Sequence, residues 1–462
     1  MRRSKALGFG LNKNRQPPVN WYDDAAYADM AVVADFNNDR YAITTVALGS
    51  IAAATAVQLK VKRASTFAEI FAYTAASVLE RTYTDVFGNI VSDRLANIHR
   101  LTFVNGKRQL RLENAATNLC LQSAFGGTLG TTWGLFDTGT LTQNSALAPD
   151  RSLTAATLLP DTTNGTHTTN QALAGSASTT YTVSCYFKRG FGQLDAGLQV
   201  NATGGVSTAS AVNFVLDGNG SVGTPAALAG GGLTGFAGTI TPCGNGWYRA
   251  TITFTTPVGT NALAVFVVTY SGTNRSFAGN GVWSVYAWGA QVEQNLFATD
   301  YIPTTTGSVT RAAEAARFSP TVEAILQRAA NSIVVRHDSS VDTTGLPRII
   351  GADTSTALIR LGGNTTTVLS TGGITLSATI GSGSTRNPMG AAMGFDGAGR
   401  SIVANGGTVA TDANAAATRT TVYLGRAATV AAGEYGDGYY DFVAILPERR
   451  TDVQLQALAV AA

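Results

Sequence analysis

A stretch near the middle of the chain alternates between apolar and polar side chains. In residues 180–188 the apolar set is Tyr181, Val183, Cys185 and Phe187, and the polar set is Thr182, Ser184, Tyr186 and Lys188. Successive side chains of a β-strand point to opposite faces, so this period of two predicts a strand with one buried and one solvent-exposed face. The pattern returns in residues 248–254 and predicts a second strand of the same kind.

The last third of the chain contains further runs typical of strands: 332–336, 348–351, 357–361 and 374–380. The segment Asp396–Gly399 is a hairpin signal, and Asp217–Gly220 is a similar turn that follows an apolar run. Near the C-terminus, Asp452 is the expected N-cap of a short helix that reaches Leu458. The apolar run 43–61 has no period that decides between helix and strand.

Composition favours short strands joined by many turns. Charged residues make up 13% of the 462 residues, about half of the usual ~25%. Glycine accounts for 51 residues, and glycine and small polar residues are abundant where chains turn. The length allows about three domains of roughly 150 residues each. We therefore expect an all-β protein.

Charge and cysteine usage argue against several classes of protein. The net charge is +3, and no run of Lys and Arg marks a nucleic-acid surface. The basic start at Arg2, Arg3 and Lys5 is not followed by the apolar core of a signal peptide, and no uncharged stretch is typical of a membrane helix. The three cysteines have no metal-ligand spacing and are expected to be free thiols. We expect no nucleic-acid partner and no membrane insertion.

An ordered series of short motifs resembles a large family of phage and prophage structural proteins. The series is Asp35–Phe36, Arg63–Thr66, Leu110–Leu119, Gly244–Arg249, Val282–Glu293 and Ala298–Thr304. The resemblance covers roughly residues 60 to 312 and implies a jelly roll similar to carbohydrate-binding modules. Residues 313–462 resemble, more weakly, a concanavalin-like or laminin-G-like lectin domain.

Pattern and resemblance together predict two tandem β-sandwiches after a mixed N-terminal region. The expected segments are a virion-attachment region (1–60), a small β-rich linker domain (61–117), the jelly roll (118–311) and the lectin-like sandwich (312–462).

The resemblance implies a spike or fibre on a phage or on a phage-like particle such as a gene transfer agent. Such a protein is assembled in the bacterial cytoplasm, is released by lysis and binds host capsular polysaccharide or lipopolysaccharide without covalent chemistry. Its other partners would be capsid or tail proteins and copies of itself, as a trimer or, at a capsid vertex, a pentamer. The alternatives are a purely structural decoration protein and, less favoured, a capsule depolymerase.

The motifs of common enzymes are missing from the sequence. Gly-x-Ser-x-Gly, His-Glu-x-x-His and the P-loop do not occur, and the acidic residues between 118 and 310 form no recognisable catalytic pair. We therefore expect no enzymatic activity, no catalytic residues and no cofactor. Modules of the resembled kind often hold a structural calcium ion, but no ligand set is recognisable here.

Sugar binding depends on aromatic rings that lie outside the core and are flanked by hydrogen-bonding groups. The jelly-roll candidates are Trp133, Tyr270 with Asn274 and Arg275, and Trp283. Loop packing is the alternative role for Trp133, and an ordinary hairpin is the alternative for Tyr270 with its neighbours. The candidates in the last domain are Asn364, Asp437 and Tyr439, for which solvated turns are the alternative.

The N-terminal region contains aromatic residues beside acidic ones: Trp21, Tyr22 and Tyr27 lie near Asp23 and Asp24. In a virion protein such a segment commonly docks on the capsid or tail, so these aromatics are candidates for virion attachment. The alternative is that they belong to the core of the protein's own first domain.

Overall fold

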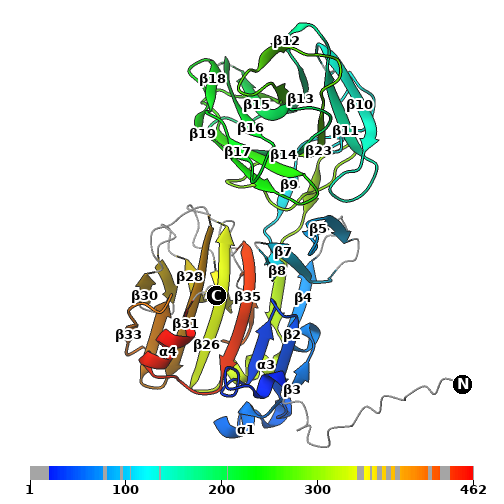
Figure 1. The fold of residues 1–462 in the computed structure, drawn as a ribbon. Coiled ribbons are helices and arrows are strands. Elements are labelled where there is room, and N and C mark those ends of the chain that lie inside the picture. Colours follow the sequence, from blue (N-terminus) through cyan, green and yellow to red (C-terminus); the bar gives the residue numbers. More distant parts are fainter. Residues whose placement is uncertain are drawn as a thin grey trace, which may run out of the picture.

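The computed structural model describes residues 20–75, 81–93, 97–104, 106–134, 137–204, 207–340, 348–353, 356–361, 367–370, 376–379, 386–414, 419–426 and 437–460. The described chain forms two lobes joined by a narrow neck (Figure 1). Every pairing between its named strands is antiparallel, and its helices are short. The predicted all-β class is confirmed.

The upper lobe is a two-sheet sandwich formed by one continuous segment. Its first sheet has the strand order β10 (Gly139–Ala146), β11 (Ala155–Pro160), β23 (Val285–Glu293), β14 (Thr180–Arg189), β20 (Tyr248–Thr255) and β19 (Thr234–Pro242). The facing sheet has the order β13 (Thr168–Ala174), β21 (Ala262–Tyr270), β15 (Asp195–Thr203), β16 (Ser207–Val215) and β17 (Ser221–Val222), with β18 (Ala226–Ala229) also on β16. A small ribbon pairs β12 (Asn164–Thr166) with β22 (Ser276–Ala278).

Strand β14 matches the predicted strand, but its second face is not open to solvent. Val183 and Cys185 enter the core between the sheets as expected. On the opposite face Thr182 and Ser184 are also buried, because residues 295–304 and neighbouring side chains cover them. Their hydroxyls are satisfied there: Thr182 donates to Asn295 O at 2.8 Å, and Ser184 accepts from Arg249 at 2.9 Å. The period of two in the sequence predicts the strand correctly, but it does not predict the segment that covers the second face of the strand.

The lower lobe is a second sandwich, made from both ends of the chain. Its larger sheet has the order β3 (Lys62–Ser65), β2 (Arg40–Thr44), β1 (Val32–Asp35), β35 (Gly438–Leu446), β26 (Asn331–Ser340), β31 (Arg386–Asp396), β32 (Gly399–Ala404) and β33 (Ala410–Asp412). In addition, β8 (Lys107–Leu112) pairs with β35, and β7 (Arg100–Val104) pairs with β8. The facing sheet has the order β30 (Leu376–Thr379), β29 (Thr367–Ser370), β28 (Thr356–Leu361), β27 (Arg348–Ala352), β34 (Val422–Leu424), β25 (Glu314–Phe318) and β4 (Phe71–Ala75).

The two ends of the chain are therefore one packing unit. Val32 of β1 lies opposite Ile445 of β35, and Phe71 of β4 lies opposite Phe318 of β25. The segments expected at 1–60, 61–117 and 312–462 all contribute to the same two sheets, and the jelly roll is inserted between them. A tandem order along the sequence does not describe this arrangement, because backbone pairing joins strands about 400 residues apart.

Short elements complete the lobes. In the neck, β9 (Ala116–Asn118) pairs with β24 (Val309–Arg311), and a nearby hairpin pairs β5 (Arg81–Thr84) with β6 (Ile90–Asp93). The helices are η1 (Trp21–Asp23), η2 (Leu48–Ser50), α1 (Ala56–Lys60), α2 (Phe67–Ile70), α3 (Pro320–Leu326) and α4 (Asp452–Leu458). Thr451, not Asp452, caps α4, because the Thr451 hydroxyl accepts from Gln454 N. No helix of the described residues is both long and apolar enough to cross a bilayer.

Candidate functional site

Two neighbouring loops at one end of the upper lobe each carry an exposed aromatic side chain. The loop after β14 carries Phe191, and the loop before β23 carries Trp283. Backbone hydrogen bonds between Ser284 and both Gly190 and Phe191, each 2.9 Å long, hold the two loops side by side. Phe191 is 67% exposed and Trp283 is 37% exposed. These rings, with exposed Val282, form what we call the aromatic patch.

Glycine lets the two loops approach closely. Gly192 has a φ of +86°, and a Cβ there would lie 2.3 Å from the Trp283 ring. The indole therefore lies directly on the Gly192 backbone. Asn280 fixes the second loop, since its side-chain oxygen accepts from the backbone N–H groups of Val282 at 3.0 Å and Trp283 at 2.8 Å.

A shallow pocket of about 70 Å³ adjoins Trp283. Its other lining residues are Leu194, Ser271, Phe277, Ala278, Gly279 and Asn280. Phe277 and Ala278 belong to β22, whose partner β12 lies at the end of the upper lobe remote from the lower lobe (Figure 1). An aromatic ring beside hydroxyl and amide groups can hold a sugar ring by stacking and hydrogen bonding.

Trp133 and Tyr270 are not exposed platforms. Trp133 is fully buried, stacks near Phe125 with ring centroids 4.4 Å apart, and donates its indole N–H to Gln122 O at 3.0 Å. Tyr270 is also buried and packs so closely on Gly197 that a Cβ there would lie 2.2 Å from the Tyr270 ring. Burial raises the pKa of Tyr270 above its ordinary value. As sugar platforms both rings would have to be exposed, so burial contradicts that role. The alternative given for Trp133, loop packing, agrees with its contacts.

Asn274 and Arg275 lie in the turn between β21 and β22. Asn274 is exposed, and its backbone pairs with Ser271, a residue that also lines the pocket beside Trp283. Arg275 is half-buried and donates to Thr166 Oγ1 at 3.3 Å and to the Gln199 side chain. Arg275 therefore ties the turn to β12 and β15, and Asn274 is the member of this pair that faces solvent beside the aromatic patch.

The candidates in the last domain do not form a surface site. Asp437 and Tyr439 are buried, at 4% and 7% exposure. Asp437 pairs with Arg111 at 2.6 Å, and the Arg111 guanidinium lies 4.4 Å from the centre of the Tyr439 ring. Burial raises the pKa of Asp437, although Arg111 opposes that shift. Neither the predicted sugar-binding role nor the alternative of solvated turns fits Asp437 and Tyr439, which are buried near the neck. Asn364 lies outside the described residues.

The N-terminal aromatics pack on the outer face of the larger lower sheet. Trp21 makes edge-to-face contacts with Tyr22 and Tyr27, with ring centroids 5.6 and 5.4 Å apart. Tyr27 in turn lies 6.3 Å from Phe442 of β35. The three rings remain partly exposed. Their packing matches the alternative that they belong to the protein's own core, and a docking role for them remains a proposal.

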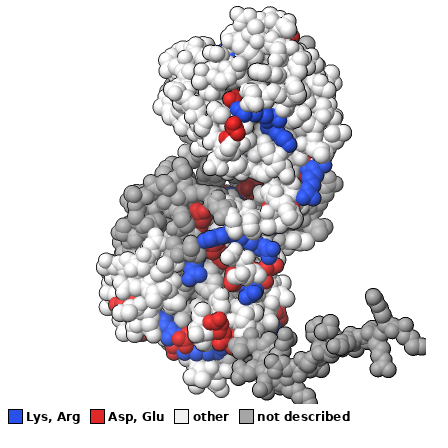
Figure 2. Space-filling model, viewed as in Figure 1, with Lys and Arg blue, Asp and Glu red and all other residues white. Residues whose placement is uncertain are grey.

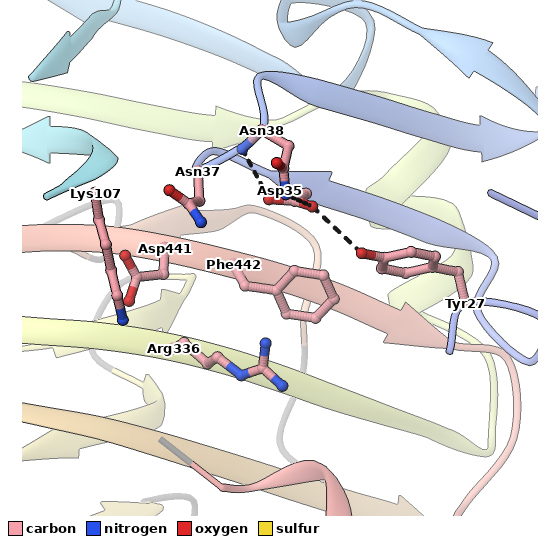
Figure 3. Close-up of a pocket in the computed structure, with 8 residues that line it drawn as sticks. All are labelled: Tyr27, Asp35, Asn37, Asn38, Lys107, Arg336, Asp441 and Phe442. Atoms are coloured by element: carbon pink, nitrogen blue, oxygen red, sulfur yellow. Dashed lines mark hydrogen bonds between the residues drawn. The ribbon is translucent and has the colours of Figure 1, made fainter. Parts of the chain in front are cut away.

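Tyr27 also borders a second pocket, of about 140 Å³, on the lower lobe (Figure 3). Its lining residues are Tyr27, Asp35, Asn37, Asn38, Lys107, Arg336, Asp441 and Phe442. They come from the segment before β1, from the end of β1 and the turn after it, and from strands β8, β26 and β35. We call this the polar pocket. Only Tyr27 was singled out from the sequence, because no local spacing connects residues from such distant segments.

The carboxylates of the polar pocket already have donors. Asp35 accepts from the Tyr27 hydroxyl at 3.3 Å and from the Asn38 backbone and side chain at 3.1 and 2.8 Å. Asp441 accepts from Gln109 at 2.8 Å, and burial raises the pKa of Asp441. Both side chains therefore help to hold the walls of the pocket in place.

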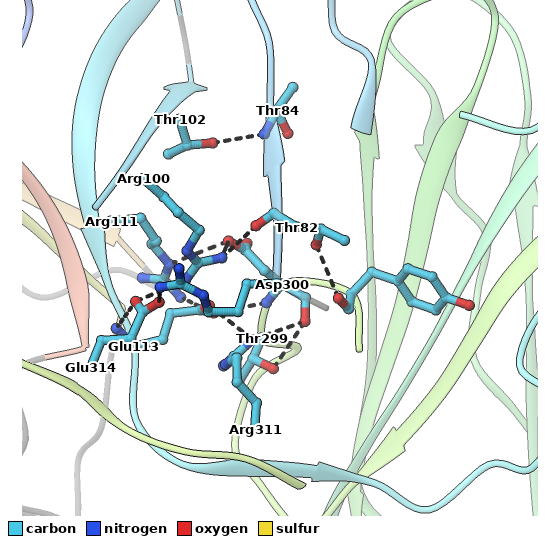
Figure 4. A network of polar contacts seen from close by, with 12 residues as sticks. Thr82, Thr84, Arg100, Thr102, Arg111, Glu113, Thr299, Asp300, Arg311 and Glu314 are labelled. Atoms are coloured by element: carbon cyan, nitrogen blue, oxygen red, sulfur yellow. Dashed lines mark hydrogen bonds and ion pairs between the residues drawn. The ribbon is translucent and has the colours of Figure 1, made fainter. Parts of the chain in front are cut away.

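A buried network of charges occupies the neck (Figure 4). Glu113 pairs with Arg100 at 2.7 Å, Arg111 at 2.9 Å and Arg311 at 2.8 Å. Arg100 also pairs with Glu314 at 2.8 Å and with Asp300 at 3.2 Å. Burial alone would raise the pKa of Glu113, but the three arginines hold it well below its ordinary value. Strands β7, β8, β24 and β25 are thereby joined where the lobes meet.

Metal and thiol chemistry receive no support in the described part of the chain. No group of three or more His, Cys, Asp or Glu side chains there is arranged to hold a metal ion. Cys120 and Cys185 are buried and Cys243 is partly exposed, all as free thiols. Burial raises the pKa of Cys120 to about 12, so this thiol stays protonated and unreactive.

Comparisons with known proteins add little. No protein-family model matches the chain, and no curated protein has a significantly similar sequence. Among solved structures, the CBM40 module of a Ruminococcus gnavus IT-sialidase bound to α2,6-sialyllactose is 16% identical, with a TM-score of 0.25, over 30% of this chain and 88% of that one. The same module bound to α2,3-sialyllactose is 14% identical, with a TM-score of 0.26, over 31% and 89%. Similarity at this level is too weak to argue from.

Proposed function

We propose that this protein is a non-enzymatic, glycan-binding component of a virion surface, and that the aromatic patch of the upper lobe contacts the glycan. The observation that carries the proposal is the exposure of Trp283 and Phe191 on two loops that are hydrogen-bonded to each other, with Trp283 next to the pocket lined by Ser271 and Asn280. Exposed apolar side chains are usual when scattered singly, whereas a contiguous patch indicates a binding surface.

The surroundings of the patch suit a saccharide of low charge. The segment 118–311 holds 13 of the chain's 61 charged residues, and the face of the upper lobe seen in Figure 2 carries few of them. Uncharged hydroxyls and amides on such a surface can exchange water for sugar hydroxyls at low desolvation cost.

The virion assignment is supported by the ordered motif series described above. The ligand would be the capsular polysaccharide or lipopolysaccharide of a bacterial host, and the N-terminal region would attach to capsid or tail proteins. Single sugar contacts are weak, so attachment would depend on several copies acting together. A homo-oligomer, such as a trimer or a pentamer at a capsid vertex, meets that need.

Binding of the purified full chain to a panel of bacterial capsular polysaccharides and lipopolysaccharides, measured by biolayer interferometry, tests the proposal. We expect Trp283→Ala and Phe191→Ala each to weaken binding several-fold, up to about tenfold, since stacking of this kind contributes roughly 0.5–1.5 kcal/mol. The matched control is Val258→Ala, which removes a 79% exposed apolar side chain outside the patch. Binding that survives both patch substitutions would refute the assignment, and no binding to any polysaccharide would favour a decoration role.

Size-exclusion chromatography of the same polysaccharides after incubation tests for depolymerisation. Unchanged chain length is expected. Glu293, one of the few acids of the upper lobe, is fully buried and accepts hydrogen bonds from Thr299 and Gln291. Chain shortening would replace the binding proposal by an enzymatic one.

A further inference from the structure

We propose that the polar pocket of the lower lobe is a second ligand site, and that it binds a carboxylate-bearing sugar residue whose carboxylate pairs with Arg336. That the ligand is a saccharide rests on the proposed function. The position of the site does not, because the pocket shares no residue with the aromatic patch.

Arg336 is held in a defined orientation by contacts at the wall of the polar pocket. Its guanidinium lies 5.1 Å from the centre of the Phe442 ring, and its Nε donates to Val460 O at 3.2 Å. These two contacts fix the plane of the guanidinium and leave its terminal amino groups to donate elsewhere. Among the described residues no carboxylate forms an ion pair with Arg336. A planar, oriented guanidinium is the group that pairs with carboxylate through two parallel hydrogen bonds.

The two carboxylates of the pocket, Asp35 and Asp441, form no close ion pair with this cation, although Arg336 acts electrostatically on Asp441. Asp35 accepts three hydrogen bonds from Tyr27 and Asn38, and Asp441 accepts one from Gln109. Lys107 lines the pocket beside Asp441 and adds positive potential there. An anionic ligand could therefore pair with Arg336 without displacing an existing ion pair of that residue.

The remaining walls suit hydroxyl groups. The Asn37 side-chain oxygen accepts from Arg108 N at 3.3 Å, and its amide nitrogen points into the pocket (Figure 3). The Tyr27 hydroxyl lies across the pocket beside Asp35. A donor amide, a phenol and carboxylate oxygens around a guanidinium match a sugar ring that carries both hydroxyls and a carboxylate.

The volume limits the ligand. About 140 Å³ is below the roughly 300–1,000 Å³ of sites that enclose drug-sized molecules. The pocket suits one sugar residue, such as a terminal or branching uronate, and not an extended chain.

Ligand-observed saturation-transfer NMR on the full chain tests the site, with D-glucuronate, D-glucose and acetate as probes. We expect glucuronate to bind at least tenfold more tightly than either glucose or acetate, and its binding to weaken as salt is raised. Equal binding of glucose would overturn the role of the carboxylate. If acetate bound as tightly as glucuronate, the inference that the ligand is a saccharide would be wrong.

Substitutions inside and outside the polar pocket test whether glucuronate binds there. Arg336→Gln should reduce glucuronate affinity at least tenfold, and Asn37→Ala, an exposed position that should not affect folding, should reduce it several-fold. Arg151→Gln removes the same charge from an exposed side chain of the upper lobe and should leave affinity unchanged. Trp283→Ala should also leave it unchanged, so failure of the aromatic patch and failure of this pocket give different results. Wild-type affinity in folded Arg336→Gln would refute the inference.

Discussion

The two lobes are both β-sandwiches, but the chain forms them in different ways. The upper lobe comes from one continuous segment, 118–311, which holds 13 charged residues, and the lower lobe is built from the segments on either side of it. The sequence outside 118–311 holds the other 48 charged residues. Strand pairs of the upper lobe are close in sequence, as in Thr180 opposite Thr255, whereas the lower lobe pairs Val32 with Ile445. Much of its charge is exposed (Figure 2), but some is buried in the neck.

This difference suggests that the two lobes use buried polar groups differently. The upper core is apolar and close to self-sufficient, so its surface loops are available for ligand contacts. The lower lobe must bring distant segments together, and buried ion pairs favour one register, because a misplaced arginine would remain without a partner in the interior. The largest effects of substitution should therefore occur at the neck.

The largest loss of stability is expected for Glu113→Gln. It leaves Arg100, Arg111 and Arg311 around a neutral amide, and breaking a buried pair in this way costs about 3–5 kcal/mol. Equilibrium urea unfolding should show this loss. The control Glu69→Gln breaks an exposed pair with Arg63 and should change stability little. Similar, small losses in both variants would mean that the neck network does not hold the lobes.

Trp133→Ala tests the independence of the upper core. Removing a fully buried indole should destabilise the upper lobe by about 3–5 kcal/mol. In calorimetry we expect the transition of the upper lobe to move to lower temperature while that of the lower lobe stays in place. Loss of polysaccharide binding without loss of stability would instead restore Trp133 as a sugar platform.

His337 gives the stability of the lower lobe a dependence on pH. Burial, with help from Arg111, lowers the pKa of His337 to about 3 from an ordinary 6.5. The unfolded chain therefore binds a proton below pH 6.5 that the folded chain does not, and stability falls by up to ~1.4 kcal/mol per pH unit between about pH 6.5 and 3. His337→Phe keeps a ring against Tyr440. Urea unfolding at pH 7 and pH 5 should show a smaller loss in the variant than in the wild type, and equal losses would contradict this.

The smallest effect on stability is expected for a substitution at Gly192, beneath the Trp283 ring of the aromatic patch. In Gly192→Ala the new methyl group would collide with the Trp283 ring and force it to move. Polysaccharide affinity should fall several-fold while calorimetric stability changes by only about 1–2 kcal/mol, the cost of a non-glycine residue in a left-handed conformation. Gly231→Ala, at a similar φ of +78° with open space around its Cβ and outside the patch and its pocket, is the matched control. Equal polysaccharide affinity in both variants would mean that the position of the Trp283 ring does not affect binding.

Local pattern was enough for individual strands and turns. The alternation at 180–188 gave β14, the alternation at 248–254 gave β20, and the Asp217–Gly220 turn links β16 to β17. Trp283 was singled out because it lies outside the core alternation. Phe191 was missed, although its place between Gly190 and Gly192, beyond the end of a strand, was an available signal.

The sequence by itself determined that this is an all-β chain with aromatic side chains in glycine-rich loops, because side-chain alternation and backbone freedom are local properties. Only the tertiary structure decided which rings are exposed and which distant strands pair. Trp133 and Tyr270 look as available as Trp283 in the sequence, but packing by residues far along the chain buries the first two. Likewise the polar pocket and the neck form only where strands from distant parts of the chain come together, and no local spacing in the sequence predicts that these strands are neighbours.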